Sequence, residues 1–308
     1  MSADPRAPRV VALVPTWSAA SFIDATLDAL AAQRCANLEI LISDDASPDG
    51  TALRCEAYVA RDARFRLIRQ PRNLGWVGNV NALLQAAQGD YLLFAFQDDL
   101  LEPGYIDRCV TALESNPRAI LAFSDIALVE QDGHRESKAY TRLDGVTDRL
   151  TRARWVALQR GSWWIPNRGV FRAGAARAIG GLRAHGAGEF SADWPWLLHM
   201  SLLGEFVRIP EQLCTKIYQP RSLSRSWNFS LRAWTEVTIS AMVSVRAAPI
   251  PVSEKLALHS TLVRFLGRHM WRTLRRWPGR MARRTGLRPA VEVAAPSASS
   301  GSAGRKTR

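Results

Sequence analysis

The chain has 308 residues, of which 47% are hydrophobic, and this is enough to bury the core of one large α/β domain or two small ones. The formal net charge is +13, but residues 261–308 alone carry +11, so residues 1–260 are nearly neutral at +2. This distribution argues against a protein that binds nucleic acid through its body, and it places the basic character in a C-terminal extension.

The cysteines and the apolar runs indicate the compartment. Four cysteines lie far apart without a CxxC pair, which disfavours a zinc site and favours a reducing environment. The N-terminus lacks the apolar stretch of a secretory signal, and no apolar run approaches the roughly 20 residues that span a bilayer. We therefore expect a cytoplasmic protein.

Residues 9–130 alternate short apolar runs with segments of helical periodicity. Strands are predicted over 9–15, 38–45, 65–70, 91–96 and 119–130, and helices over 21–33, 51–62, 77–88 and 103–114. Ser21 stands at the N-cap position of the first helix. Strands separated by helices predict right-handed βαβ units and a mainly parallel sheet.

The second half of the chain is less regular. Residues 131–190 show little periodicity apart from a short helix over 173–179. Beyond them we predict a helix over 190–204 with Ser191 as its N-cap, a strand over 205–218, and helices over about 230–246 and 253–277. The Pro/Ala/Ser/Gly-rich residues from about 288 are predicted to be disordered.

Polar clusters follow three of the predicted strands, at the carboxyl ends where such sheets bind ligands. They are Pro15-Thr16-Trp17, Asp44-Asp45 and Gln97-Asp98-Asp99. The pair Asp98-Asp99 suits a hard divalent cation that also bridges phosphate oxygens. The pair Asp44-Asp45 suits the N–H groups of a base or the hydroxyls of a ribose. Ordinary turn and capping chemistry is the alternative for each cluster.

Further polar residues near the predicted helix starts are candidates for phosphate or ribose contacts. Asparagines in the glycine-rich segment 73–81 can bind such groups or cap the helix that follows, and basic residues after the last strand can approach a diphosphate or face solvent. Asp193 lies near the N-terminal end of the helix predicted over 190–204, and a helix N-terminus favours its ionised form, so it is suited to accept a proton. Glu189 is a competing base, whereas His199 is assigned to packing.

The segments PTWSA, SDDASPDGT, NLGWVGNVN, QGDYLLFAF and QDD, in this order and spacing, resemble the motifs of a family 2 glycosyltransferase with the GT-A fold. The resemblance is strong over residues 9–115 and weaker to about 226. It implies transfer of a sugar, mostly with inversion, from a UDP-, dTDP- or GDP-sugar to a hydroxyl of a glycan or lipid-linked acceptor.

The resemblance also implies roles for individual residues. Asp98 and Asp99 would bind Mg²⁺ or Mn²⁺ through the donor diphosphate, and Asp193 would be the catalytic base. Together with the polar clusters above, it gives the following candidates for nucleotide-sugar binding: Pro15, Thr16, Asp44, Asp45, Asn73, Gly75, Asn81, Gln97, Asp98, Lys216, Arg221 and Arg225. Two positions depart from the family pattern, because Phe96 replaces the first acid of the metal motif and Ala192 replaces the common Glu before the base.

The expected architecture is an α/β fold with a single GT-A-type, Rossmann-like domain over 9–226, whose mixed, mainly parallel sheet is flanked by helices. A flexible N-terminus over 1–8 precedes it, and a helical region over 227–285 and a basic tail over 286–308 follow it. In the helix over 253–277, apolar and arginine side chains occupy different faces: Leu262, Leu266, Met270, Leu274 and Trp277 on one, and Arg264, Arg268, Arg272 and Arg275 on another. Such a helix can lie on the anionic inner face of the cell membrane, which makes peripheral attachment a hypothesis, or it can pack on the body.

Two other classes of function compete with sugar transfer. A nucleotidyltransferase of similar fold usually carries a glycine-rich loop with Lys or Arg after the first strand, and PTWSAASF has neither feature. A nucleic-acid-binding protein is suggested only by the basic C-terminus, and we find no specific nucleic-acid-binding motif. A relative of the same fold that has lost its activity is a third possibility.

Overall fold

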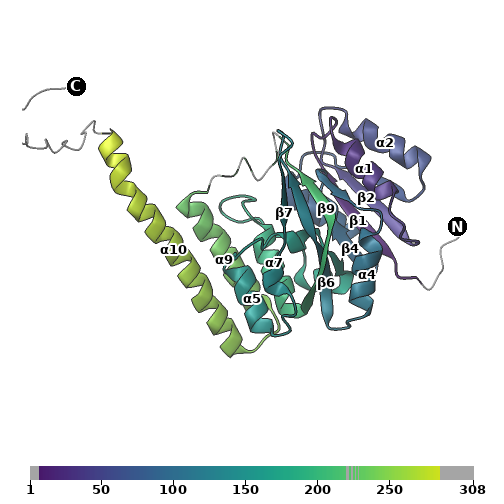
Figure 1. Ribbon diagram of the computed structural model, residues 1–308. Helices are drawn as coiled ribbons and strands as arrows, with labels where there is room; N and C mark the ends of the chain where they lie inside the picture. The colour runs from purple at the N-terminus through teal and green to yellow at the C-terminus, as the bar shows by residue number, and fades with distance from the viewer. Residues whose placement is uncertain (1–6, 220–221, 223–224, 226, 228, 285–308) are drawn as a thin grey trace, which may run out of the picture. The chain divides into compact units, whose positions relative to one another are not determined.

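A computed structural model describes residues 7–219, 222, 225, 227 and 229–284, with side chains up to Thr273. The predicted basic tail over 286–308 lies outside these residues, as does Arg221. Within the described residues, a mixed sheet of nine strands forms the centre (Figure 1), with the order β3-β2-β1-β4-β8-β6-β9-β5 and with β7 paired to β6. The strands are β1 (Val10–Thr16), β2 (Leu38–Asp44), β3 (Phe65–Arg69), β4 (Tyr91–Phe94), β5 (Asp99–Leu101), β6 (Ala119–Val129), β7 (Arg135–Lys138), β8 (Val170–Arg172) and β9 (Glu205–Ile217).

Parallel ladders account for most of the paired residues in this sheet. They join β3, β2, β1 and β4 in turn and also join β6 to β9. Antiparallel ladders join β8 to β4 and β6, β5 to β9, and β7 to β6. All seven residues of β1 are buried, as expected for a strand of a parallel sheet that is covered on both faces. The predicted mixed, mainly parallel sheet is confirmed.

Helices cover both faces of the sheet, with α1, α2 and α4 on one side and α5, α7 and α9 on the other (Figure 1). None of the helices in the described residues combines the length and the hydropathy that crossing a bilayer requires. The helices are α1 (Ile23–Ala31), α2 (Thr51–Arg61), α3 (Gly75–Ala86), α4 (Tyr105–Glu114), α5 (Arg149–Ala157), α6 (Ala173–Ile179), α7 (Asp193–Leu203), α9 (Leu231–Ala247) and α10 (Val252–Arg284), with 3₁₀ turns η1 (Thr141–Leu143) and η2 (Ile165–Arg168).

The two predicted serine N-caps are wrong. Helix α1 follows Phe22 and α7 follows Ala192, and neither helix receives a side-chain capping bond. Main-chain turns before the helices take the place of the serine hydroxyls, since the Ile23 N–H donates to the carbonyl oxygen of Ala19 at 2.9 Å. Likewise, the Trp194 N–H donates to the carbonyl oxygen of Ser191 at 3.0 Å.

The chain divides into two units, with the boundary between His269 and Met270 of α10. The first unit includes α9 and the first half of α10, which the sequence assigned to a separate C-terminal region. Leu258, Leu262 and Phe265 of α10 are buried. The Phe265 ring lies 5.0 Å from the Trp194 ring of α7, measured between centroids, so this half of α10 is part of the hydrophobic core.

Candidate functional site

The carboxyl ends of β1, β2 and β4 meet at one edge of the sheet. Thr16 lies opposite Asp44 in the β1–β2 register. The Thr16 hydroxyl donates to Oε1 of Gln97 at 2.8 Å, and the Trp17 N–H donates to the same oxygen at 2.9 Å. The predicted candidates at these strand ends, including the buried Pro15, are therefore brought together, with Gln97 joining β1 to the end of β4.

The two acids at the end of β2 have different environments, although both are buried. Oδ2 of Asp44 accepts a hydrogen bond from the Ser47 N–H at 3.1 Å, whereas its Oδ1 is buried and has no partner in the part of the chain that the structure describes. Oδ1 of Asp45 accepts from the Leu74 N–H at 2.7 Å. Burial raises the pKa of Asp45, and the charges of Glu189 and Asp44 add to this effect, while backbone N–H donors oppose it. Asp44 thus retains an unfilled hydrogen-bond acceptor.

The first turn of α3 is capped from two directions. Oδ1 of Asn73 accepts from the Gly75 N–H at 2.9 Å. Oε1 of Glu189 accepts from the Val77 N–H at 2.7 Å, although Glu189 belongs to the loop before α7. This contact gives Glu189, the rival candidate for the base, a structural partner at the N-terminus of α3.

Asn81 ties α3 to the loop that leads to α7. Its Nδ2 donates to the carbonyl oxygen of Leu182 and its Oδ1 accepts from the Leu182 N–H, both at 2.9 Å. Both polar groups of the amide are therefore used in holding the loop that carries Glu189 and ends at Asp193.

Each acid of the predicted metal motif lies beside a cation. Nζ of Lys216 donates to Oδ2 of Asp98 at 2.7 Å and lies 3.9 Å from Oδ1 of Asp99. The β5–β9 ladder creates this contact, because Asp99 is the register partner of Lys216. Asp99 is only 2% exposed, and its Oδ2 lies 2.7 Å from Nε of Arg168. Two carboxylates and two cations therefore form a locally neutral group.

Arg168 is held by two aromatic rings as well as by Asp99. Its guanidinium carbon lies 5.2 Å from the ring centroid of Phe96 and 5.0 Å from that of Trp164. Such cation–π contacts are strengthened by burial, and Arg168 is buried. Phe96, which replaces the first acid of the metal motif, thus forms one wall of the Arg168 site.

Asp193 is the first residue of α7, and a neutral side chain holds it. Nδ2 of Asn167 donates to Oδ2 of Asp193 at 2.6 Å, while Oδ1 is buried and has no hydrogen-bond partner among the described residues. Burial raises the pKa of Asp193 to about 6, against the opposing effects of the Arg168 charge, the backbone N–H groups and the Asn167 hydrogen bond. Since Asn167 and Arg168 are consecutive, a single turn contacts both Asp193 and Asp99.

Arg225, the last basic candidate that the structure describes, lies near the end of β6. It forms an ion pair with Glu130, and its guanidinium carbon is 4.8 Å from the ring centroid of Tyr218. Lys216 lies against the same ring, with Nζ 5.1 Å from the centroid. The aromatic ring of Tyr218 thus brings these two cations near each other.

The profile of glycosyl transferase family 2 matches residues 11–173, which is more than half of the chain. The chain belongs to this family. An uncharacterized glycosyltransferase of Haemophilus influenzae is 32% identical over 109 residues, which are 35% of this chain and 34% of that protein. The chain spans about a third of the length of the curated relatives it matches.

Solved structures support the fold of this family 2 member. Residues 1–349 of S. aureus TarS, in complex with UDP-GlcNAc, superpose with a TM-score of 0.67 at 15% identity, covering 83% of this chain and 72% of TarS 1–349. The mannosyltransferase PcManGT from Pyrobaculum calidifontis, in complex with GDP-Man and Mn²⁺, gives a TM-score of 0.54 at 15% identity, covering 92% of this chain and 82% of PcManGT. The GT-A-type fold predicted from the sequence is confirmed.

Sequence reasoning missed two residues at the centre of this candidate site, Asn167 and Arg168. They lie in GSWWIPNRGVF, where an amide and a guanidinium stand between apolar residues on both sides. Polar side chains in such a setting need partners when they are buried. Their position within an apolar stretch was therefore the feature of the sequence that could have indicated a role for them.

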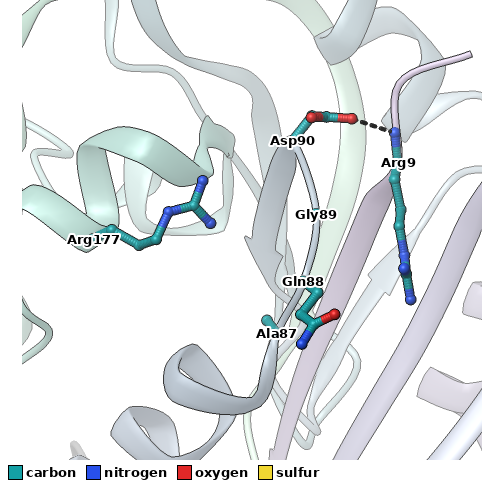
Figure 2. A pocket seen from close by; sticks show the side chains of 6 residues that line it. All are labelled: Arg9, Ala87, Gln88, Gly89, Asp90 and Arg177. Atoms are coloured by element: carbon teal, nitrogen blue, oxygen red, sulfur yellow. Dashed lines mark hydrogen bonds between the residues drawn. The ribbon is translucent and has the colours of Figure 1, made fainter.

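A separate hollow of about 450 Å³ lies at the opposite edge of the sheet (Figure 2). It surrounds the turn before β4, and Arg9 and Arg177 lie on its two sides. The Arg9 N–H donates to Oδ2 of Asp90 at 2.9 Å. This hollow adjoins the amino ends of β1 and β4, whereas parallel sheets bind their ligands at the carboxyl ends, so we do not assign it to the family 2 site.

Proposed function

We propose that this family 2 member transfers a sugar from a nucleoside-diphosphate sugar to a hydroxyl of a glycan or lipid-linked acceptor. The proposal is carried by the meeting of three groups of acids at one edge of the sheet. The β1–β2 register places Asp44 opposite Thr16, and contacts continue from there through the pairs Thr16–Gln97, Asp98–Lys216, Asp99–Arg168 and Asn167–Asp193. The complexes of TarS with UDP-GlcNAc and of PcManGT with GDP-Man support a donor of this class.

Asp44 is the strongest candidate for nucleoside binding. Its Oδ1 is buried and unpartnered within the described ranges, and an unsatisfied buried carboxylate oxygen costs about 1–3 kcal/mol or more. A base N–H or a ribose hydroxyl would satisfy this oxygen when the donor binds. Asp45 then acts indirectly, because it fixes Leu74 at the entry of α3 beside the same site.

Asp193 is our candidate for the general base. With a pKa of about 6 it is ionised at neutral pH, yet it is more basic than an exposed aspartate. Asp193 takes the proton of the acceptor hydroxyl while that oxygen forms a bond to the anomeric carbon. The bond from this carbon to the donor diphosphate breaks on the opposite face, and the nucleoside diphosphate leaves with the bonding electrons. One such displacement inverts the configuration at the anomeric carbon.

The residues present fit a divalent metal at Asp98 better than at Asp99. Lys216 engages Oδ2 of Asp98, so Oδ1 is the oxygen that we assign to Mg²⁺ or Mn²⁺, whereas Asp99 is buried against Arg168. In the described residues, no three His, Cys, Asp or Glu side chains gather closely enough to hold a metal, so the donor must supply oxygen ligands as well. When bound, the metal would neutralise charge on the leaving diphosphate. Mn²⁺ in the PcManGT complex supports this assignment.

Donor binding by calorimetry tests the proposal. We would titrate UDP-GlcNAc, dTDP-glucose and GDP-mannose with and without Mg²⁺ or Mn²⁺. One donor should bind more tightly with metal, Asp98→Asn should remove the metal-dependent part, and Asp44→Asn should weaken binding in both conditions. The matched control is Asp132→Asn, an exposed acid after β6, which should bind as the wild type does. If none of the donors binds, or if Asp44→Asn leaves the affinity unchanged, the assignment fails.

We also propose that α10 attaches this protein to an anionic membrane surface. The predicted apolar face is partly used inside the protein, because Leu262 is buried. Another apolar face remains exposed, where Leu256 and Val263 are seven residues apart and therefore lie on the same side of the helix. Arg264 next to it is exposed, and residues 261–308 carry +11, so both hydrophobic and electrostatic terms favour anionic lipid.

Co-sedimentation with vesicles separates the hydrophobic from the electrostatic contribution to membrane binding. The full chain should bind phosphatidylglycerol vesicles and not phosphatidylcholine vesicles, and the double variant Leu256→Asn/Val263→Asn should bind the former more weakly. Leu53→Asn on α2 is the matched control, since Leu53 is 67% exposed and Leu256 is 66% exposed. Equal sedimentation of the double variant and the wild type would exclude this face of α10 as the contact.

A further inference from the structure

The turn η2 places two buried side chains between acids that are remote in sequence. Asn167 is 2% exposed and donates Nδ2 to Asp193 at 2.6 Å. The next residue, Arg168, contacts Asp99 at 2.7 Å. The proposed transfer reaction assigns no role to either side chain, although burying an amide and a guanidinium is costly unless each has a defined partner.

The contacts of Arg168 fix the position of the turn. Besides its two aromatic neighbours, its carbonyl oxygen accepts from the Tyr105 hydroxyl at 2.5 Å. At Gly169, which follows, an added Cβ would lie 2.5 Å from the carbonyl oxygen of Ala122, so the backbone is pressed against β6. The Asn167 amide is therefore presented from a rigid support, and a rigid support is what holding a reactive group in one geometry requires.

The hydrogen bond from Asn167 to Asp193 has a chemical consequence for that carboxylate. Asn167 engages Oδ2, which leaves Oδ1 as the oxygen with unfilled hydrogen-bonding capacity. An amide N–H stabilises the ionised carboxylate without forming the direct salt bridge that a Lys or Arg would form, so the carboxylate keeps its affinity for a proton.

We propose that Asn167 is the positioning residue of the general base, orienting Asp193 through Oδ2 so that Oδ1 receives the acceptor proton, with Arg168 anchoring the turn to Asp99. This inference rests on the proposed function for the role of Asp193. It goes beyond that function because it assigns to η2 the orientation of Asp193, which requires both the Asn167 amide and the rigid backbone of the turn.

The state of the carboxylate provides a readout that does not require a known donor. The groups that act on Asp193 are Asn167 and Arg168 from η2 and the backbone N–H groups of Asp193 and Trp194 from its own helix. The Asn167 hydrogen bond lowers the pKa of Asp193 against the effect of burial. Removing this donor should therefore raise the pKa of Asp193, by about one pH unit if the bond has the usual strength of a hydrogen bond to a charged group.

Carboxyl NMR of the full chain labelled with ¹³C-aspartate measures this shift, with the Asp193 signal assigned by its absence in Asp193→Asn. In Asn167→Ala the titration midpoint of Asp193 should rise by about one pH unit. The control is Asn116→Ala, because Asn116 also donates Nδ2 to a carboxylate, Oε2 of Glu205 at 3.0 Å, at the start of β9. This control should leave the Asp193 midpoint unchanged.

A second readout separates positioning from structure. With whichever nucleotide sugar supports transfer, Asn167→Ala should lower kcat about tenfold and leave the KM for the donor near the wild-type value. If Asn167→Ala does not fold, Asn167→Leu, which keeps the volume but has no donor, decides by the same two measurements. An unchanged midpoint in a folded variant overturns the inference. Full transfer activity of Asp193→Asn would instead overturn the assignment of Asp193 as the base. The NMR measurement does not depend on that assignment, because it reports only whether Asn167 acts on the Asp193 carboxylate.

Discussion

The two ends of the proposed site compensate their acids in different ways. At the metal motif, Asp98 and Asp99 lie beside Lys216 and Arg168, so each carboxylate has a cation. At the start of α7, Asp193 is held by a neutral amide. Burial raises the pKa of both Asp99 and Asp193, but at Asp99 the charges of Arg168 and Lys216 oppose this effect from a direct ion pair, whereas Asp193 is held by an amide and has no ion pair.

This difference corresponds to the two substrates of the proposed reaction. The donor brings a negatively charged diphosphate, and a neutralised metal motif does not repel it as two bare carboxylates would. The acceptor brings a hydroxyl that must lose a proton, and we propose that Asp193 takes it. The comparison predicts that removing the charge of Asp193 affects mainly the rate of transfer. Removing the charge of Arg168 at the metal motif should affect mainly the stability of the fold.

The largest effect is expected at the acceptor end. Asp193→Asn should lower transfer about 10³-fold, because the amide cannot accept the proton, while donor affinity stays unchanged. The same variant should gain roughly 1–2 kcal/mol of stability at pH 7, because a carboxylate with its pKa raised to about 6 destabilises the fold when ionised. Transfer rates at saturating donor, together with urea unfolding, measure both effects. Unchanged transfer would contradict the base assignment.

The opposite pattern is expected at the metal-motif end. Arg168→Met should destabilise the protein by about 3–5 kcal/mol, because it leaves Asp99 buried without its closest cation. The control is Arg108→Met, whose pair with Glu211 is solvent-accessible, with side chains 56% and 44% exposed, and which should cost less than about 1 kcal/mol. Urea unfolding measures both variants, and a loss as small as that of the control would mean that Asp99 is not ionised in the fold.

The donor half of the site could be predicted from the sequence for a physical reason. Strands β1, β2 and β4 are parallel and covered on both faces, so they appear as continuous apolar runs whose ends are easily located. Parallel strands also place their carboxyl ends at the same edge, so that Thr16, Asp44 and Gln97 could be grouped without knowledge of the register. The structure places them there.

The acceptor half could not be predicted in the same way, because its contacts depend on pairing between distant segments. The contact between Lys216 and Asp99 follows from the β5–β9 register, and β5 has only three residues. Helix α5 was missed because buried Arg152 interrupts its apolar pattern, and its Nε donates to the carbonyl oxygen of Ser201 at 2.9 Å. The sequence allowed Asn81 either to bind the donor or to cap a helix. Its hydrogen bonds to Leu182, which is remote in sequence, are visible only in the fold.

The pH dependence of transfer gives the next largest effect. The proposed base must be ionised, so kcat should rise with pH through the pKa of Asp193, about 6, and reach a plateau near pH 7. At pH 5 we expect roughly a tenfold loss, since about one carboxylate in ten remains ionised one pH unit below its pKa. Donor affinity measured over the same range should vary less, because Asp193 is not among the residues proposed to bind the donor. A plateau that extends to pH 5 would contradict a base with this pKa.

The smallest effect concerns Glu189, an acid compensated by a helix N-terminus instead of a cation. Gly75 and Gly50 both have positive φ, of 76° and 84°, so alanine at either position should cost about 1 kcal/mol in backbone strain. At Gly75 the added Cβ would also lie 2.6 Å from Oε1 of Glu189, whereas at Gly50 it meets no atom within 4 Å. Gly75→Ala should therefore lose about 1 kcal/mol more than Gly50→Ala, because Glu189 must leave the Val77 N–H. Urea midpoints of the two variants test this difference, and equal losses would mean that the Glu189 contact contributes nothing to holding the loop before Asp193.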